Sequence, residues 1–324
     1  MTSIDTFREA FIHYLQEKVT LKEPKNLYEP ITYILALGGK RLRPVLTLMS
    51  CELFNAPFQK ALDASLAIEL FHNFSLIHDD IMDNAPLRRG KVTIHEKWNL
   101  NTGILSGDAM LILAYQFFEN YDPIPSQQLA KLFSKTAIEV CEGQQYDIDF
   151  EDREDVTIED YLHMINYKTA VLAGAAMTMG AIVAGATKIS QENIYEFGRN
   201  LGMAFQLQDD YLDVFGEPKL FGKQVGGDII SNKKTFIYLT AQREASAEDQ
   251  KELEHLYSIQ PENPKDKIEA IKRIFENSGA KIKTQEEIKN FTNKAILLLE
   301  NIAITEQGKK QLTDFATHLI FRNI

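Results

Sequence analysis

Apolar side chains recur at helical spacing along most of this chain, and that periodicity limits the possible fold more than any other feature. Phe7, Phe11 and Leu15 repeat every four residues, and the same spacing continues between Leu62 and Ile77. Residues four apart lie on one face of an α-helix, so each run can bury a single apolar stripe. Runs that alternate apolar and polar residues, as strands do, are hard to find. The sequence therefore predicts an all-α fold.

Further helical runs are separated by short breaks rich in Asn, Pro and Gly. The runs cover residues 105–118, 129–140, 158–165 and 194–215, and the breaks fall at residues 55–57, 84–86, 122–125, 216–218 and 261–264. None of these breaks has the length or composition of a flexible linker. Residues 265–324 continue as amphipathic helices without chemical motifs. We expect residues 1–324 to form a single domain of ten or more helices.

Composition and charge argue against several classes of protein. The net charge of −11 and the pI of about 5.2 disfavour a broad basic surface for nucleic acid. Residues 169–187 carry no charge, but Ala, Gly, Thr and Met dominate them, which predicts a buried helix rather than a transmembrane segment. Cys51 and Cys141 lack metal-ligand spacing and are expected to be reduced, as in a cytoplasmic protein. The charged start of the chain does not resemble a signal peptide.

Two acidic clusters share the pattern D-D-x-x-D, one from Asp79 to Asp83 and the other from Asp209 to Asp213. Carboxylates four residues apart project from one helix face, with Cβ atoms about 6 Å apart, and repel each other unless a cation lies between them. If the two clusters faced each other, they would form an oxygen-only ligand set suited to Mg²⁺ and a bound phosphate. A single cluster would more simply be a solvated helix end. The repetition favours the metal site.

Two basic motifs accompany the first acidic cluster. A glycine pair at Gly38 and Gly39 precedes Lys40, Arg41 and Arg43, a combination that suits a compact anion because the backbone can approach it closely. A guanidinium grips phosphate with two parallel hydrogen bonds, whereas an ammonium acts as a point charge. A plain cationic loop is the alternative.

The second motif, Arg88-Arg89-Gly90, lies five residues beyond Asp83. Its arginines either neutralise the carboxylates or bind two separate phosphate groups, since adjacent side chains point in different directions. We favour phosphate binding.

Two more motifs accompany the second acidic cluster. Lys168 and Thr169 open the uncharged helix, but a lone Lys-Thr pair is also consistent with an ordinary helix start. Residues 221–228 combine glycines, a lysine and Asp228, and Lys233 and Lys234 follow. This composition favours a lid that closes over phosphates. A plain surface loop is the alternative.

Together these motifs resemble those of the trans-isoprenyl (polyprenyl) diphosphate synthases, of the short-chain geranylgeranyl and farnesyl type. The resemblance covers about residues 28–236 and rests on residues 38–44, 75–83, 88–90, 143–147 and 205–213. It implies the isoprenoid synthase fold, an all-α bundle around a deep central cavity, usually as a homodimer. It also implies a Mg²⁺-dependent prenyltransferase that joins isopentenyl diphosphate head-to-tail to an allylic diphosphate, with three Mg²⁺ per active site.

The resemblance also assigns roles to individual residues. Metal ligands are Asp79, Asp83 and Asp209, with Asp213 and Asp228 acting in the outer shell or through water. The allylic diphosphate is held by Arg88, Lys168, Lys223 and Lys233, with Lys234 as the alternative to Lys233. Isopentenyl diphosphate is held by Lys40, Arg43, His72 and Arg89, and Thr169 and Gln206 line the reacting centre. His72 on its own could equally be a buried core histidine.

Product length is expected to depend on bulky residues below the first acidic cluster. Phe74 lies ~7 Å and Phe71 ~12 Å below Asp79 along the helix, on neighbouring sides of it, and Ser75 leaves room beside them. In the family, an aromatic residue at the place of Phe74 accompanies C15 or C20 products. We favour geranylgeranyl diphosphate, with farnesyl diphosphate second. Ordinary helix packing is the alternative role for both rings.

Three other functions compete with this interpretation. A longer-chain polyprenyl diphosphate synthase of the same family is the main one. A terpene cyclase would replace the second D-D-x-x-D motif and lack the site for isopentenyl diphosphate. A non-catalytic prenyl-diphosphate-binding subunit would tend to lose acidic motifs that this chain retains.

Overall fold

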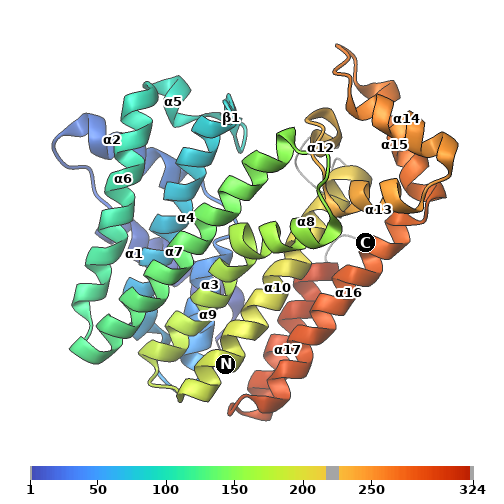
Figure 1. The fold of residues 1–324 in the computed structure, drawn as a ribbon. Helices are drawn as coiled ribbons and strands as arrows, with labels where there is room; N and C mark the ends of the chain where they lie inside the picture. Colours follow the sequence, from blue (N-terminus) through green and yellow to red (C-terminus); the bar gives the residue numbers. More distant parts are fainter. Residues whose placement is uncertain (1, 217–225, 322–324) are drawn as a thin grey trace. The chain divides into compact units, whose positions relative to one another are not determined.

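The computed structural model describes residues 2–216 and 226–321, and over these residues the chain is almost entirely helical (Figure 1). Its longest helices are α4 (Leu62–Met82), α7 (Pro123–Asp152), α10 (Lys188–Phe215) and α16 (Ala280–Leu298). The expected all-α architecture of ten or more helices is therefore confirmed. The helical runs read from the sequence all fall within helices of the structure, because their apolar stripes are buried as the spacing requires.

Shorter elements complete the described residues. The N-terminal ones are α1 (Ile4–Lys18), α2 (Lys25–Ala36), α3 (Leu42–Leu53), η1 (Phe58–Ala61), α5 (Ile94–Lys97), α6 (Leu100–Gln116) and η2 (Phe117–Asn120). The central ones are α8 (Ile158–Ile165), the π-helix η3 (Asn166–Ala170), α9 (Val171–Val183), α12 (Gly227–Ile230) and α13 (Phe236–Glu244). The C-terminal ones are α14 (Ala247–Tyr257), α15 (Lys265–Asn277), η4 (Leu299–Asn301) and α17 (Glu306–Phe321).

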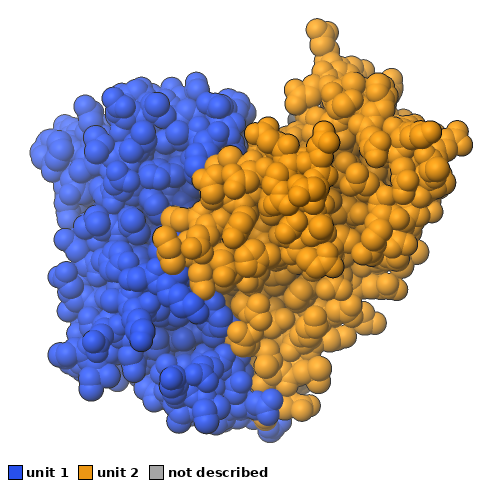
Figure 2. Space-filling model, viewed as in Figure 1, with its two compact units in different colours: residues 1–137, 175–195, 301–308 blue, residues 138–174, 196–300, 309–324 orange. Residues whose placement is uncertain are grey.

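The chain divides into two compact units (Figure 2). Unit 1 comprises residues 1–137, 175–195 and 301–308, and unit 2 comprises residues 138–174, 196–300 and 309–324. The helices α7, α9, α10 and α17 contribute residues to both units, so the division falls within helices rather than in a linker. Each unit carries one D-D-x-x-D motif.

In unit 1, α4 is the central element and contacts α1, α3 and α6. Its apolar face is fully buried, and Phe71 forms part of an aromatic core with Phe118 and Phe133. In unit 2, α13 contacts α8, α15 and α16.

The uncharged stretch 169–187 contains the whole of α9, and the residues from Val171 to Ile182 are buried. This confirms the prediction of a buried helix. Among the described residues, no helix combines the length and the hydropathy needed to cross a membrane.

One feature not foreseen from the sequence is a short hairpin directly after α4. Its strands β1 (Leu87–Arg88) and β2 (Lys91–Val92) pair antiparallel, with Leu87 opposite Val92 and Arg88 opposite Lys91. The two turn residues, Arg89 and Gly90, both have positive φ, at 52° and 72°. Two successive left-handed residues make the tight turn that best matches the twist of paired strands. The strands are too short for an alternating pattern to reveal them.

Candidate active site

The first acidic motif occupies the C-terminal end of α4. Asp79 and Asp80 lie in the last turn, and Asp83 follows it directly, its N–H donating to the carbonyl of Asp79 at 2.9 Å. The unpaired carbonyls at a helix C-terminus carry partial negative charge, so carboxylates are unfavourable there unless cations compensate them. The C-terminal end of α4 therefore favours the binding of cations.

Arg88 supplies one such cation from the hairpin. Its Nε donates to Oδ2 of Asp80 at 2.7 Å, and its Nη2 lies 2.7 Å from Oδ1 of the same carboxylate. The second contact of Nη2, with Oδ2 of Asp79, is longer at 3.5 Å. Arg88 thus neutralises Asp80, the middle member of the motif, which is one of the two roles that the sequence left open.

Arg89 points to a different place. Because it occupies the first turn position of the hairpin, its side chain leaves the strand and donates to the carbonyl of Gly38. A Cβ atom at residue 39 would come within 2.9 Å of the Arg89 guanidinium carbon, and Gly39 has a φ of 125°. Only glycine suits that position. Gly39 therefore makes room for the Arg89 guanidinium, and the carbonyl of Gly38 accepts its hydrogen bond.

Arg43, His72 and Arg89 form a cationic cluster within unit 1. Nη1 of Arg43 lies 3.3 Å from Nε2 of His72. Burial, together with the charge of Arg89, lowers the pKa of Arg43 to about 10, and burial and Arg43 hold the pKa of His72 well below its usual range. Burial and other arginines also lower the pKa of Arg89. Burial is the largest cause of each shift and neighbouring positive charge adds to it, so an incoming anion would oppose the contribution of the charge.

The second acidic motif occupies the C-terminal end of α10. Asp209, Asp210 and Asp213 lie in its last two turns. Oδ2 of Asp213 accepts a hydrogen bond from the backbone N–H of Asp228 at 2.9 Å. This contact ties the start of α12 to the end of α10 and holds two of the predicted ligands together.

Asp210 is buried and hydrogen-bonded on both oxygens. The hydroxyl of Tyr161 donates to Oδ2, and Nε2 of Gln206 donates to Oδ1 at 3.0 Å. Burial and the charge of Asp228 raise the pKa of Asp210 to about 8, against the opposing effect of these two donors. Oε1 of Gln206 in turn accepts from the hydroxyl of Thr169 at 3.1 Å. The chain of contacts fixes the orientation of the Gln206 amide.

Lys168 and Thr169 lie in a π-helical turn. The preceding helix, α8, begins with a capping box in which Thr157 and Asp160 satisfy each other's backbone N–H groups. At Asn166 the helix widens into the π-turn, and Nζ of Lys168 pairs with the carboxylate of Asp147 on α7. A Cβ at Gly143 would lie 2.2 Å from the backbone nitrogen of Lys168, so glycine allows α7 to approach the turn.

Lys233 and Lys234 have different surroundings. Nζ of Lys234 donates to the carbonyls of Phe150 at 2.9 Å and Glu151 at 3.2 Å, and to that of Arg153. These are carbonyls at the C-terminal end of α7, so Lys234 acts as a helix cap. That role favours Lys233 over Lys234 as the phosphate contact. Lys223 and most of the predicted lid lie outside the described residues.

The rings of Phe71 and Phe74 are neighbours on α4. Their centroids are 5.5 Å apart, and Phe71 also contacts Phe133 at 5.2 Å. Phe71 is 1% exposed and Phe74 is 9% exposed, so Phe71 belongs fully to the core. The hydroxyl of Ser75 donates to the carbonyl of His72 at 2.8 Å.

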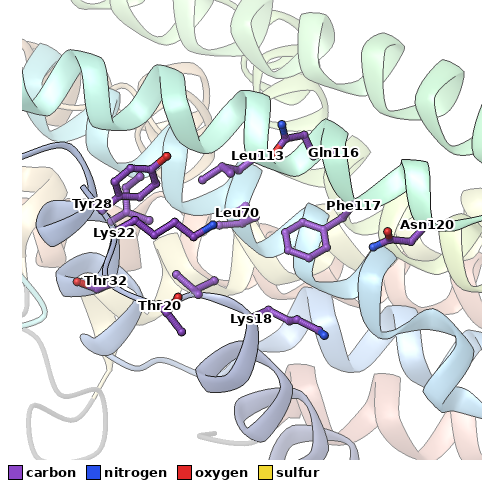
Figure 3. A pocket seen from close by; sticks show the side chains of 12 residues that line it. Lys18, Thr20, Lys22, Tyr28, Thr32, Leu70, Leu113, Gln116, Phe117 and Asn120 are labelled. Carbon is purple, nitrogen blue, oxygen red and sulfur yellow. The ribbon is translucent and has the colours of Figure 1, made fainter. Parts of the chain in front are cut away.

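A cavity of about 240 Å³ lies in unit 1 beside Leu70, one helical turn from Phe74 (Figure 3). Figure 3 shows it lined by side chains of α2, α4 and α6 and of the connection between α1 and α2. Apolar groups such as Leu113 and Phe117 face it together with the lysines Lys18 and Lys22.

Comparison with known proteins shows the family to which this chain belongs. The polyprenyl synthetase family model matches residues 24–274. The chain belongs to the polyprenyl synthetase family. A crystal structure of a geranylgeranyl pyrophosphate synthase is 52% identical, with a TM-score of 0.96 over 99% of both chains.

Two curated relatives extend the comparison. A geranylgeranyl diphosphate synthase of Methanosarcina mazei is 37% identical over 74% of this chain and 76% of its own. A geranylfarnesyl diphosphate synthase of Natronomonas pharaonis is 35% identical over 84% and 83%. The protein is therefore an enzyme, a trans-isoprenyl diphosphate synthase with isoprenyl diphosphate substrates.

The residues of this polyprenyl synthetase fit a hard divalent cation at either acidic motif. Both motifs present several carboxylates at the negative end of a helix, which is the oxygen donor set that Mg²⁺ prefers. Within residues 2–216 and 226–321, no three acidic, histidine or cysteine side chains are grouped to hold a metal ion. The predicted site combines motifs of both units, so it stays a prediction.

Several site features of this polyprenyl synthetase were missed from the sequence. Tyr161 and Asp210 form a buried pair 49 residues apart, and Arg41 pairs with Glu69 across 28 residues. No local pattern marks such partners, because a buried polar residue can be matched only once the tertiary contact is known. The pairing of Asp147 with Lys168 had a signal in the sequence, because Asp147 is the acidic residue that ends the 143–147 motif.

Proposed function

We propose that this enzyme condenses isopentenyl diphosphate head-to-tail with an allylic diphosphate and stops at the C20 product, geranylgeranyl diphosphate. The cationic cluster of Arg43, His72 and Arg89 is the observation that carries the proposal. Two partly buried guanidinium groups with lowered pKa values, beside the imidazole of His72, favour a bound anion, and the diphosphate of isopentenyl diphosphate is an anion of suitable size.

Isopentenyl diphosphate would bind to this cluster. Arg43 and Arg89 would each hold phosphate oxygens, and His72, neutral before binding, would donate a hydrogen bond. Lys40, which is exposed at the end of the glycine pair, would add a fourth contact. Holding the diphosphate here fixes the double bond for attack on the allylic carbon, which lowers the entropic cost of the bimolecular step.

The allylic diphosphate would bind between the acidic motifs. Asp79, Asp83 and Asp209 would hold three Mg²⁺, with Asp213 and Asp228 acting through water. Bound Mg²⁺ would supply Lewis-acid stabilisation of the departing diphosphate. Lys168, Lys233 and Lys223 would add positive charge, and Arg88 would join them from its place beside Asp79.

The π-turn would stabilise the allylic carbon after the C–O bond ionises. In a π-turn the usual hydrogen-bond ladder is interrupted, and such turns occur often at functional sites. We infer that a backbone carbonyl released there, together with Thr169 and Gln206, stabilises the positive carbon. The buried apolar wall of α9 would exclude water, which would otherwise capture the cation as an alcohol. The proton lost at the end would pass to the departing diphosphate.

Chain length would be limited by Phe74. Its ring lies below Asp79 on α4, backed by Phe71, and the small Ser75 leaves one side open. A C15 product would require a bulky side chain closer to Asp79 than Phe74 is. A longer polyprenyl product, the main alternative, would need the chain to pass Phe74 towards the cavity beside Leu70.

We also propose that both units act as one domain and that the enzyme is a homodimer. Leu105 and Ile112 lie two turns apart on α6 and are 59% and 60% exposed. Side chains this apolar on one helix face suit a subunit contact. A terpene cyclase or a non-catalytic subunit fits less well, because this chain retains both acidic motifs and the cationic cluster.

A product assay tests this function. Purified protein is incubated with Mg²⁺, labelled isopentenyl diphosphate and either dimethylallyl, geranyl or farnesyl diphosphate, and the dephosphorylated products are sized. We expect a C20 alcohol from each primer. Products of more than 25 carbons would favour the alternative, and the absence of any extended product would reject the proposal.

Variants separate chemistry from folding in the same assay. Asp79→Asn and Asp209→Asn should each lower kcat by about 10³-fold or more while leaving the helical circular dichroism unchanged. Asp63→Asn removes the same charge from the opposite end of α4 and serves as the control, with activity retained. Full activity in the Asp79 and Asp209 variants would contradict the assigned roles.

A further inference from the structure

A buried ion pair lies directly behind the cationic cluster. Arg41 donates through Nη1 to Oε1 of Glu69 on α4 and through Nη2 to the carbonyl of Leu35 on α2. The two charged side chains are only 4% and 3% exposed. Nδ2 of Asn73 also donates to Oε1 of Glu69 at 3.2 Å, so the carboxylate accepts from two side chains. Nothing in the proposed reaction uses any of these groups directly.

The backbone at Arg41 needs this pair. Arg41 has φ 49° and ψ 39°, in the left-handed region, where a side chain is unfavourable. It is the residue that precedes α3, and it follows two glycines that also have positive φ. Three left-handed residues within four positions are not a conformation that the loop would keep alone. The contacts of Arg41 with two separate helices hold it.

The pair also fixes the distance between two parts of the cationic cluster. Lys40 and Arg43 come from the loop and the start of α3, on either side of Arg41 in sequence. His72 comes from α4, one turn beyond Glu69, so both residues lie on one side of that helix. Any slip of the loop along α4 would therefore separate Arg43 from His72, whose nitrogens are now 3.3 Å apart.

We propose that Arg41 and Glu69 are a positioning pair for isopentenyl diphosphate: they set the register of the 38–43 loop against α4, so that Lys40, Arg43 and His72 meet the same diphosphate. This inference rests on the proposed function. Arg41 would act through this loop and not by binding substrate, because its guanidinium donates to Glu69 and Leu35.

A merely stabilising role would not require charge. Replacing a buried ion pair by apolar residues of similar volume is often neutral or favourable for stability, whereas removing one partner leaves an uncompensated charge. The planar guanidinium, however, can bridge two acceptors on different helices, which no apolar side chain can do. Loss of register with retained stability is the result that distinguishes positioning from simple packing.

The test is the double variant R41M/E69M, which removes one positive and one negative charge and so leaves the net charge unchanged. We expect the KM for isopentenyl diphosphate to rise about tenfold, because a displacement of about 1 Å in a positioned group is costly. The KM for the allylic diphosphate should stay within about twofold. Hydrolysis of the allylic diphosphate in the absence of isopentenyl diphosphate should continue at the wild-type rate.

Two further measurements keep the test decisive. R41K retains the charge but lacks the longer, planar guanidinium that spans the two acceptors, so it should show the same selective rise, at about threefold, even if the double variant does not fold. Asp63→Asn, which removes the charge of the carboxylate that accepts from the Tyr14 hydroxyl elsewhere in unit 1, should leave both KM values unchanged.

Equal rises for both substrates would overturn the proposal, because they would indicate a general structural role. Unchanged KM values in a folded variant would overturn it as well. Failure of the wild-type enzyme to extend any primer would instead count against the proposed function.

Discussion

Replacing Phe74 by Ala should lengthen the product, whereas replacing Phe71 should mainly weaken the fold. The two rings are neighbours, yet their surroundings differ. Phe71 is 1% exposed and contacts Phe74 and Phe133, and Phe133 in turn contacts Tyr115 and Phe118. Phe74 is 9% exposed and has only Phe71 and His78 as ring partners among the described residues. Phe71 therefore packs against Phe74 from the side of the core.

The magnitudes follow from these contacts. Truncating a buried Phe to Ala costs ~3–5 kcal/mol, and each well-placed aromatic pair contributes a further ~0.5–1.5 kcal/mol. Phe71→Ala should therefore lower Tm by roughly 10 °C or more, and Phe74→Ala by less. The ring removed at Phe74 is about as large as one five-carbon unit. We expect the main product of Phe74→Ala to gain at least one such unit, since the cavity beside Leu70 lies one turn further down.

The assay compares product lengths and thermal unfolding for both variants. Labelled isopentenyl diphosphate and farnesyl diphosphate are supplied at saturating concentration, and the dephosphorylated products are separated by chain length. Phe7→Ala is the matched control, because Phe7 is fully buried in α1 and its ring partner is Phe58. It should lose stability without any change of product.

Two outcomes would refute the reasoning. An unchanged length profile for Phe74→Ala, at full saturation with isopentenyl diphosphate, would show that Phe74 does not limit the chain. A longer product from Phe71→Ala with Phe74 in place would show that the limit lies deeper than proposed.

Two further predictions concern the lysine pair and the buried histidine. Lys233→Ala should lower kcat/KM for the allylic substrate about 100-fold with little loss of stability. Lys234→Ala should instead cost about 2 kcal/mol of stability, because it removes the cap of α7. Kinetics and thermal unfolding of both variants test this prediction, and reversed effects would contradict it. Because burial and Arg43 lower the pKa of His72, the folded state binds fewer protons than the unfolded state below pH ~6.5. Stability should therefore fall as pH drops from about 7 to 5, by at most ~1.4 kcal/mol per pH unit. His72→Gln should flatten this dependence in unfolding curves, and an unaltered slope would count against the assignment.

The helices were largely predictable from the sequence. The apolar periodicity placed α4, α8 and α10, because a helix depends on neighbours three and four residues apart along the chain. The same local rule placed three carboxylates of each acidic motif in one or two turns at a helix end. The hairpin at residues 87–92 escaped this rule, since strands of two residues have no period to detect.

The partners of the charged residues could not be predicted in this way. Arg88 and Arg89 are adjacent, and only the turn between β1 and β2 sends one to Asp80 and the other to Gly38. Likewise, Lys233 and Lys234 look equivalent in the sequence. The carbonyls at the end of α7, more than 80 residues away, distinguish them.

The sequence by itself therefore determined the helical architecture, the family and the residue types of the site, because these depend on short-range spacing. Only the tertiary structure decided which charges neutralise each other, where the π-turn opens and how Arg41 is held by Glu69. A buried polar group is stable only with a partner of the right geometry, and that partner is chosen by packing between distant segments.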